Sequence, residues 1–366
     1  MPRTSLGLVI LILQAVSTLA RADGAIDRLI EQTGVEEGPV PLREMSGWHA
    51  PDKIVLRSAS EYIDEFRHEY PSIEFVNADS EDDAIAQAQG ADAIIGFCSQ
   101  RLLDAARDAE WIQIFSAGAE RCVPVTQVKS GKVVLTNMQK MSSPVLAEHA
   151  VAMMLSLARG LVTWSKEMHT GQWLDSGPKA PRLTELEGQT VLVVGLGGIG
   201  TEVARRASAL GMHVTGTRRS SHEGPAFVDY VGLPDELERL ASDADFVVNA
   251  LPLTPETEGL FDKDFFAAVK PGAYFISIGR GKSTVTQDLI AALESGQIAG
   301  AGLDVTDPEP LPPDNPLWQF DNVIITPHVA GRGGSFARHL VLLRDNIRRF
   351  IAGDALLNVV DPQRGY

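Results

Sequence analysis

The chain has 366 residues, of which 44% are hydrophobic and 22% charged, so it holds enough apolar material for a buried core and is not intrinsically disordered. Its 48 acidic and 32 basic residues give a formal net charge of −16, which argues against nucleic acid and anionic membranes as partners. Two cysteines, Cys98 and Cys122, are too few for a Cys-rich zinc site or a disulfide framework, and the sequence does not show whether they pair. We expect no metal site, so any redox chemistry must come from a bound organic cofactor.

The first 22 residues differ in composition from the rest. They contain no acidic residue; Arg3 precedes the apolar run from Leu6 to Ala15, and Ala20-Arg21-Ala22 has the small-x-small pattern of a cleavage site. The pattern predicts a signal peptide over residues 1–22 and an exported protein, periplasmic or secreted. The alternative is an uncleaved hydrophobic start on a cytoplasmic protein. Residues 23–52 are rich in Gly and Pro, and the sequence assigns this N-terminal extension no role.

From Lys53 onward, short β-branched runs alternate with helical patterns, which is the spacing of βαβ units. Two series of runs are separated by a long predicted helix over 144–159, and a last helix is predicted over 335–352. The pattern predicts an α/β protein with two doubly wound parallel-sheet domains, Rossmann-like or flavodoxin-like, and an active-site cleft between them. The predicted strands lie at residues 53–58, 73–76, 93–97, 111–117, 132–137, 191–195, 213–217, 245–251, 273–279, 301–305 and 322–328.

The segment GLGGIG at residues 195–200 follows the apolar strand VLVV and opens an amphipathic helical stretch. In this context Gly195 permits a tight turn, Gly197 lets the backbone approach a pyrophosphate, and Gly200 lets helix and strand pack closely. The motif therefore predicts a dinucleotide site, with an ordinary tight βα turn as the alternative. Its candidate cofactor-binding residues are Gly195, Gly197, Gly198, Ile199 and Gly200.

The end of the next predicted strand indicates which dinucleotide binds. An enzyme that uses NAD places an acid there for the ribose 2′-hydroxyl, but this chain has Thr217-Arg218-Arg219-Ser220. Guanidinium groups bind a 2′-phosphate in a fork, and Ser220 can donate a further hydrogen bond. We therefore expect NADP(H) to be preferred, with NAD(H) possible; the alternative is that Arg218 and Arg219 are two solvated surface residues.

Three polar residues follow strands of the same predicted domain: Arg280, Glu309 and His328. Because ligands bind beyond the carboxyl ends of parallel strands, these positions are candidates for catalysis. Hydride transfer to a 2-keto acid requires a cation that holds the carboxylate and polarises the keto oxygen, which suits Arg280. It also requires an acid that protonates this oxygen, which suits His328, with Glu309 orienting the ring.

Long motifs run through the chain from about Lys53 to Tyr366: AEHAVAMMLSLARG, ELEGQTVLVVGLGGIG, NALPLTPETEGL, KPGAYFISIGRGKSTVTQDLIAALESGQIAGAGLDVTDPEPLPPDNPLW, NVIITPHVAG and NIRRFIAGDALLNVVD. In these motifs the sequence resembles the D-isomer-specific 2-hydroxyacid dehydrogenase family, and more narrowly its glyoxylate/hydroxypyruvate reductase-like, NADPH-preferring branch. The resemblance implies a homodimer that transfers a hydride between NADPH and a small 2-keto or 2-hydroxy acid.

The resemblance also implies roles for particular residues. Arg280, Glu309 and His328 become the catalytic set, with Arg280 also binding substrate. The turn at residues 116–119 would give backbone N–H groups of Ala117 and Gly118 to the substrate carboxylate. Residues 53–142 plus 331–366 would form the substrate-binding domain and residues 143–330 the NAD(P)-binding domain, to which Leu251 and Pro252 contribute cofactor contacts.

One alternative from another class keeps the same fold. A non-catalytic NAD(P)(H)-sensing or interaction protein would retain the nucleotide site without needing Arg280, Glu309 and His328 together. The presence of all three favours the enzyme. The sequence does not identify the 2-keto acid, because loop side chains of unknown direction set the size of the pocket.

Overall fold

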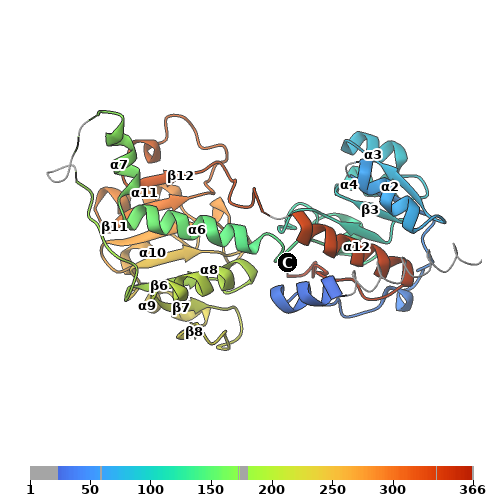
Figure 1. Cartoon of the computed structure of the whole chain (residues 1–366), viewed down its shortest axis with the longest axis horizontal. Coiled ribbons are helices and arrows are strands. Elements are labelled where there is room, and N and C mark those ends of the chain that lie inside the picture. Colours follow the sequence, from blue (N-terminus) through green and yellow to red (C-terminus); the bar gives the residue numbers. More distant parts are fainter. Residues whose placement is uncertain (1–23, 58–59, 172, 174–179, 335, 365–366) are drawn as a thin grey trace, which may run out of the picture. The chain divides into compact units, whose positions relative to one another are not determined.

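The computed structural model describes residues 24–57, 60–171, 173, 180–334 and 336–364. The chain divides into two compact units (Figure 1): unit 1 comprises Met1–Met141 with Ser335–Tyr366, and unit 2 comprises Ser142–Gly334. Each unit is built on one parallel sheet, so the predicted α/β class with two doubly wound sheets is confirmed. The predicted signal peptide, residues 1–22, lies outside the described residues.

Unit 1 has a five-stranded parallel sheet in the order β2-β1-β3-β4-β5. The central strands β1, β3 and β4 are almost entirely buried, which explains why they read as continuous apolar runs. The strands are β1 Lys53–Leu56, β2 Glu74–Asn77, β3 Ala93–Ile95, β4 Trp111–Gln113 and β5 Val134–Thr136. The helices are α2 Ser60–Glu69, α3 Glu81–Gln87, α4 Gln100–Ala105, α5 Thr126–Lys129 and α12 Phe336–Ala352, with a 3₁₀ turn η1 at Leu42–Glu44.

The N-terminal extension, which the sequence leaves without a role, belongs to the core of unit 1. Residues 24–33 are helical, and the buried side chains of Ile26, Leu29 and Leu42 pack in the same cluster as the apolar face of α12. The sheet of unit 1 is therefore covered by both ends of the chain.

Cys98 and Cys122 are paired as a disulfide, with their Cα atoms 5.8 Å apart. This separation lies in the range usual for disulfides. Cys98 follows β3 and Cys122 follows the turn after β4, so the bond joins the loops that leave two neighbouring strands.

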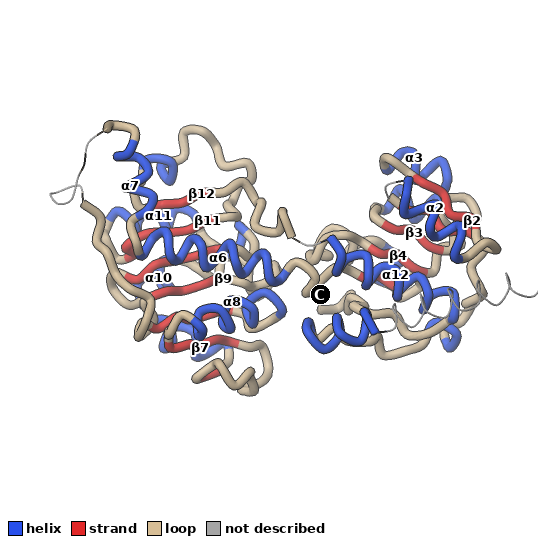
Figure 2. Tube along the Cα trace, viewed as in Figure 1, coloured by secondary structure: helices blue, strands red, loops and turns tan. Residues whose placement is uncertain are grey.

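Unit 2 has a seven-stranded parallel sheet in the order β12-β11-β10-β9-β6-β7-β8 (Figure 2). The short strand β8, which is not among the strands predicted from the sequence, pairs with β7 at one edge. The strands are β6 Thr190–Val194, β7 His213–Thr217, β8 Tyr230–Gly232, β9 Phe246–Asn249, β10 Ala273–Ser277, β11 Ile298–Leu303 and β12 Val323–Ile325. The helices are α6 Ser143–Ala158, α7 Leu161–Met168, α8 Gly198–Ala209, α9 Leu237–Ala241, α10 Lys263–Ala268 and α11 Thr286–Glu294, with 3₁₀ turns η2 Pro234–Glu236, η3 Gly281–Ser283 and η4 Pro316–Gln319.

Helix α6 packs against α8 and the sheet of unit 2 through buried Ala147, Ala150, Met153 and Met154. Its methionines are thus core residues. Within the described part of the chain no single helix is long and apolar enough to cross a membrane; the bent pair of α6 and α7 passes that test only when the two helices are taken together.

Candidate active site

The glycine-rich turn lies between β6 and α8, and its motif glycines Gly195 and Gly200 meet different steric demands. Gly195 has φ of 96°, in the left-handed region that favours glycine. A Cβ on Gly200 would collide with the carbonyl oxygen of Gly195, so only glycine allows helix and strand to approach this closely. A Cβ on Gly197 would meet no atom within 4 Å. The turn is therefore tightly packed at Gly200 and open at Gly197. The open position leaves room for a pyrophosphate to approach the backbone.

Helix α8 starts at Gly198 and continues through Ile199 and Gly200. Its N-cap is Gly197, and no side chain caps the helix start. Backbone N–H groups at this end, together with the positive end of the helix dipole, form an environment that favours an anion. This geometry fits the phosphates of a dinucleotide without any charged side chain in the turn itself.

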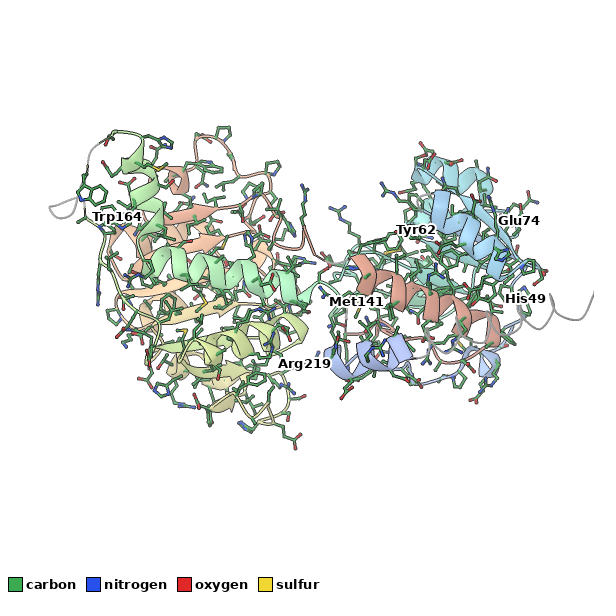
Figure 3. The ribbon with its side chains drawn as sticks, viewed as in Figure 1. His49, Tyr62, Glu74, Met141, Trp164 and Arg219 are labelled. Carbon is green, nitrogen blue, oxygen red and sulfur yellow. A yellow bond between two sulfur atoms is a disulfide. The ribbon has the colours of Figure 1, made fainter. Side chains whose placement is uncertain are left out.

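Arg218 and Arg219 follow β7, the strand that pairs with β6 ahead of the glycine-rich turn. The half-buried Arg218 donates its backbone N–H to the carbonyl of Gly232 on β8. Its side-chain Nε is buried and has no hydrogen-bond partner among the described residues. A buried guanidinium nitrogen without a partner is costly, so an anionic ligand here would satisfy it. The next residue, Arg219, is exposed (Figure 3), and so is Ser220.

The loop after β9 carries the carboxylate of Glu256, which is not among the residues predicted from the sequence. The pKa of exposed Glu256 is lowered, first by a hydrogen bond from the Thr254 side chain and also by the positive charge of Arg219. The same loop carries Leu251 and Pro252. A Cβ on Gly195 would lie 2.9 Å from Leu251 Cδ2, so Leu251 contacts the glycine-rich turn directly. Pro252 accepts a hydrogen bond from the Thr257 hydroxyl through its carbonyl, at 2.7 Å.

Arg280, Glu309 and His328 follow β10, β11 and β12, which are neighbouring parallel strands. Their carboxyl ends therefore lie at the same edge of the sheet. The loops also touch, because a Cβ on Gly281 would collide with the backbone carbonyl of Thr306. The structure thus brings the loop of Arg280 against the loop that leads to Glu309.

Glu309 and His328 form a direct pair. His328 Nδ1 lies 2.9 Å from Glu309 Oε2, and Glu309 Oε1 accepts the backbone N–H of Thr306 at 3.0 Å. His328 is half exposed and has φ of 51°, in the left-handed region. Because Glu309 engages Nδ1, Nε2 is the ring nitrogen through which His328 can exchange a proton with a ligand.

The backbone around Arg280 is held by a buried asparagine. Asn249, at the end of β9, donates to the hydroxyls of Ser277 and Ser283 at 3.1 and 2.7 Å. Ser283 in turn donates to the carbonyl of Arg280 at 2.7 Å, and the Arg280 guanidinium donates to the carbonyl of Gly279 at 2.9 Å. Asn249 is not among the site residues predicted from the sequence. Its position, a polar residue near the end of a predicted strand, is one that the sequence does show.

The other predicted substrate contacts, Ala117 and Gly118, lie in unit 1, in the loop that follows β4. The Ala117 carbonyl accepts from the Asn137 side chain at 2.7 Å, and the Gly118 carbonyl accepts from the Ser116 hydroxyl at 2.8 Å. These bonds fix the turn within unit 1. Among the described residues, no group of three or more His, Cys, Asp or Glu side chains is placed to hold a metal ion.

Fold and site together define a dinucleotide-binding oxidoreductase. Residues 151–330 match the family described as D-isomer specific 2-hydroxyacid dehydrogenase, NAD binding domain. A glyoxylate reductase/hydroxypyruvate reductase of Mus musculus is 35% identical over 263 residues, which cover 70% of this chain and 79% of that protein. A glyoxylate reductase of Pyrococcus furiosus is 33% identical over 256 residues, covering 67% and 74%.

Solved structures agree with these relatives. A D-isomer specific 2-hydroxyacid dehydrogenase of Xanthobacter autotrophicus Py2, in complex with NADPH and MES, aligns with a TM-score of 0.73 at 29% identity and covers 87% of this chain and 100% of that one. An NADPH-dependent glyoxylate/hydroxypyruvate reductase of Sinorhizobium meliloti, in complex with NADP and sulfate, aligns with a TM-score of 0.71 at 27% identity and covers the same fractions. The chain belongs to the D-isomer specific 2-hydroxyacid dehydrogenase family. It is an NAD(P)-dependent oxidoreductase that acts on CH–OH groups.

Proposed function

We propose that the protein is an NADPH-dependent reductase of small 2-keto acids, of the glyoxylate and hydroxypyruvate class. The observation that carries the proposal is the Glu309–His328 pair at 2.9 Å, formed at the same sheet edge that presents Arg280. The relatives from Mus musculus and Sinorhizobium meliloti are glyoxylate/hydroxypyruvate reductases, which supports the substrate class.

The glycine-rich turn would hold the pyrophosphate, and the loop of Leu251 and Pro252 would line the nucleotide site. Bound NADPH supplies a hydride to the keto carbon of the substrate. Arg280 binds the substrate carboxylate and polarises the keto oxygen, since a guanidinium matches both acceptors. His328 donates the proton from Nε2 to that oxygen and becomes neutral, and the Glu309 carboxylate at Nδ1 stabilises the protonated ring before this transfer.

The backbone N–H groups of Ala117 and Gly118 would add hydrogen bonds to the substrate carboxylate. This role comes from the resemblance to the family, supported by the way Asn137 and Ser116 fix the carbonyls of that turn.

A panel of small 2-keto acids, assayed by oxidation of NADPH and of NADH, tests the activity directly. We expect turnover of glyoxylate or hydroxypyruvate with NADPH.

His328→Ala should lower kcat by about 100-fold or more, because proton donation to the keto oxygen is lost. Arg280→Ala should damage both kcat and KM, and Glu309→Gln should alter the pH profile of the reduction. Unchanged turnover in His328→Ala would remove this residue from the mechanism, and absence of turnover on the whole panel would favour a nucleotide-binding sensor.

The preference for NADPH is carried by Arg218, Arg219 and Ser220. The unpartnered buried Nε of Arg218 supports a phosphate at this position. Arg218→Asp should lose about 10-fold to 100-fold in kcat/KM for NADPH, because charge-assisted hydrogen bonds are lost. The control is kcat/KM for NADH, which should change little. Equal use of NADH and NADPH by the unaltered protein would contradict the assignment.

We further propose a homodimer. Unit 2 exposes several large apolar side chains around α7, and such exposure on a soluble domain is typical of an interface. They are Leu161, Met168, Trp173 and Leu183, with exposed fractions of 51%, 68%, 95% and 48%. Light scattering after gel filtration should give twice the mass of one chain, and Met168→Glu should shift it towards the monomer.

Export is proposed from two features. The first 22 residues have the composition of a cleavable signal. The Cys98–Cys122 disulfide suits an oxidising compartment, since cytoplasmic proteins rarely keep disulfides. N-terminal sequencing of protein from its native host tests this: a chain that starts near Asp23 supports export, and an intact Met1 or Pro2 in the cytoplasmic fraction contradicts it.

A further inference from the structure

Asp304 lies directly after β11 and fixes the segment that contains His328. Its side chain is only 1% exposed, and its carboxylate accepts three hydrogen bonds from residues 326–330. The donors are the Thr326 hydroxyl at 2.6 Å and the backbone N–H groups of Val329 and Ala330, both at 2.9 Å. The carbonyl of Asp304 also accepts the backbone N–H of His328 at 2.9 Å. One buried residue therefore holds the segment on both sides of His328.

A second histidine joins this network from another element. His149 lies on α6, and its Nε2 is 3.0 Å from the Thr326 hydroxyl oxygen and 3.7 Å from Asp304 Oδ1. The Thr326 hydroxyl has a single proton, which the short bond to Asp304 uses. The Thr326 oxygen therefore acts as acceptor towards His149, and His149 must carry its proton on Nε2.

The segment needs such support because of its backbone. His328 has φ of 51°, a conformation that is uncommon for residues with a Cβ and that the surrounding contacts help to maintain. In this conformation its ring is paired with Glu309. Loss of a contact that holds Thr326 would let the segment relax and would misalign His328 Nε2.

We propose that His149 is a positioning residue for the reaction: by donating from Nε2 to Thr326, it completes the Thr326–Asp304 network that keeps His328 oriented. The inference rests on the proposed role of His328 as proton donor. It extends the site to α6, the helix that begins at Ser143, next to the boundary of the two units at residues 141 and 142.

Matched variants test the role. His149→Leu removes the donor at similar size and should lower kcat for glyoxylate about 10-fold, with little change in KM for NADPH. His149→Gln places an amide N–H near the same position and should recover most of the activity. Thr326→Val should lower kcat at least as much as His149→Leu, because it removes the bonds of Thr326 to both His149 and Asp304, whereas Thr326→Ser should stay close to the unaltered protein. The double variant His149→Leu/Thr326→Val should be no slower than Thr326→Val alone, because the His149–Thr326 bond is already lost in that single variant.

Several results would overturn the proposal. These are an unaltered kcat in His149→Leu, equal losses in His149→Leu and His149→Gln when both are folded, or additive losses in the double variant. If His149→Leu does not fold, the position of the proton on the His149 ring of the unaltered protein still decides. Melting temperature and far-ultraviolet circular dichroism establish which variants are folded.

A measurement on the resting protein separates this inference from the proposed function. Nitrogen-15 NMR of the histidine rings, with His149→Gln to assign the signal, should show His149 protonated at Nε2. A ring protonated only at Nδ1 would overturn the network whatever the enzyme does. Unchanged turnover in His328→Ala would instead defeat the proposed function while leaving the NMR result standing.

Discussion

The two units use the same kind of sheet but are held together differently. Unit 2 is one continuous stretch of chain, and its functional side chains lie in turns that directly follow its strands. Unit 1 is assembled from both ends of the chain, with residues 24–57 and α12 packed in one core. Local sequence motifs therefore suffice to mark the site in unit 2, whereas unit 1 depends on contacts between distant residues.

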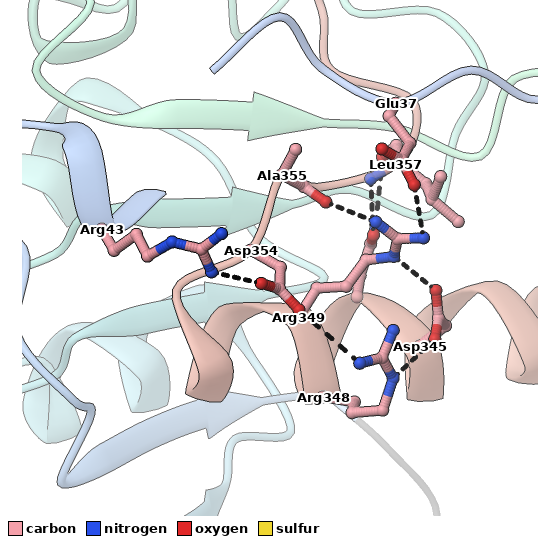
Figure 4. Close-up of polar contacts among 9 residues, drawn as sticks. Glu37, Arg43, Asp345, Arg348, Arg349, Asp354, Ala355 and Leu357 are labelled. Carbon is pink, nitrogen blue, oxygen red and sulfur yellow. Dashed lines mark hydrogen bonds and ion pairs between the residues drawn. The ribbon is translucent and has the colours of Figure 1, made fainter. Parts of the chain in front are cut away.

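An ion-pair network joins α12 to the N-terminal segment of unit 1 (Figure 4). Arg349, on α12, donates to Asp345 at 2.6 Å and to Glu37 of the N-terminal segment at 2.8 Å. Arg348 also donates to Asp345, at 2.9 Å, while Arg43 pairs with Asp354. The side chains of Asp345 and Arg349 are 7% and 11% exposed, so the central pair is shielded from solvent. Burial raises the cost of leaving either charge alone.

The largest effect is expected in unit 2, at the glycine-rich turn. Gly200→Ala should prevent the close approach of α8 to Gly195, because the added methyl group collides with backbone that cannot move aside. It should lower the melting temperature markedly and abolish binding of NADPH. The matched variant Gly197→Ala meets no atom within 4 Å, so it should keep the melting temperature and weaken only NADPH binding. Similar melting temperatures for both variants would show that the turn is not closed by packing.

The next effect concerns the disulfide of unit 1. Replacing Cys98 and Cys122 by Ser removes a bond between residues 24 positions apart and should destabilise unit 1 by about 3 kcal/mol, chiefly by freeing the unfolded chain. Hydrogen exchange resolved by peptide should show faster exchange in β3 and β4 than in the unaltered protein. Peptides from β6 and α8 of unit 2 serve as the internal control. Equally faster exchange in both units would contradict the expectation that the disulfide stabilises unit 1 alone.

A smaller loss is expected from the ion-pair network. Asp345→Asn leaves two arginines without their shared carboxylate and should cost about 2 kcal/mol, because Arg349 is nearly buried. Arg101→Ala breaks an exposed pair with Asp82, whose side chains are 72% and 81% exposed, and should cost less than about 1 kcal/mol. Equal stability of the two variants, measured by hydrogen exchange in residues 24–44 and α12, would mean that the network does not hold the N-terminal segment against α12.

The smallest effect depends on pH. Burial lowers the pKa of His49, but the Gly47 carbonyl and the carboxylates of Asp92 and Glu110 together raise it above its ordinary value. A raised pKa in the folded state stabilises unit 1 below the unfolded pKa of about 6.5, and this contribution is lost as the pH rises through the folded value. The difference in melting temperature between the unaltered protein and His49→Gln should therefore be larger at about pH 6 than at about pH 8. Since the His49 side chain is 52% exposed, the difference is small, and a constant difference across this range would contradict it.

The sequence by itself predicted the two parallel sheets, because alternating apolar runs and helical patterns are local properties of the chain. It also predicted that Arg280, Glu309 and His328 would gather, since the carboxyl ends of parallel strands share one edge. The steric demands on Gly195 and Gly200 follow from the motif for the same reason: strand, turn and helix are contiguous in sequence. The catalytic roles themselves stay predictions.

Only the tertiary structure decided which distant segments meet. Residues 24–33 show little periodicity, yet they fill the core beside α12, and β8 is a strand only because β7 offers it an edge. Cys98 and Cys122 pair because β3 and β4 are neighbours in the sheet. His149 reaches Thr326 across 177 residues of chain, a contact set by the packing of α6 on the sheet and by no local pattern. Contacts of this kind depend on the register and order of all the elements at once, so no local sequence pattern predicts them.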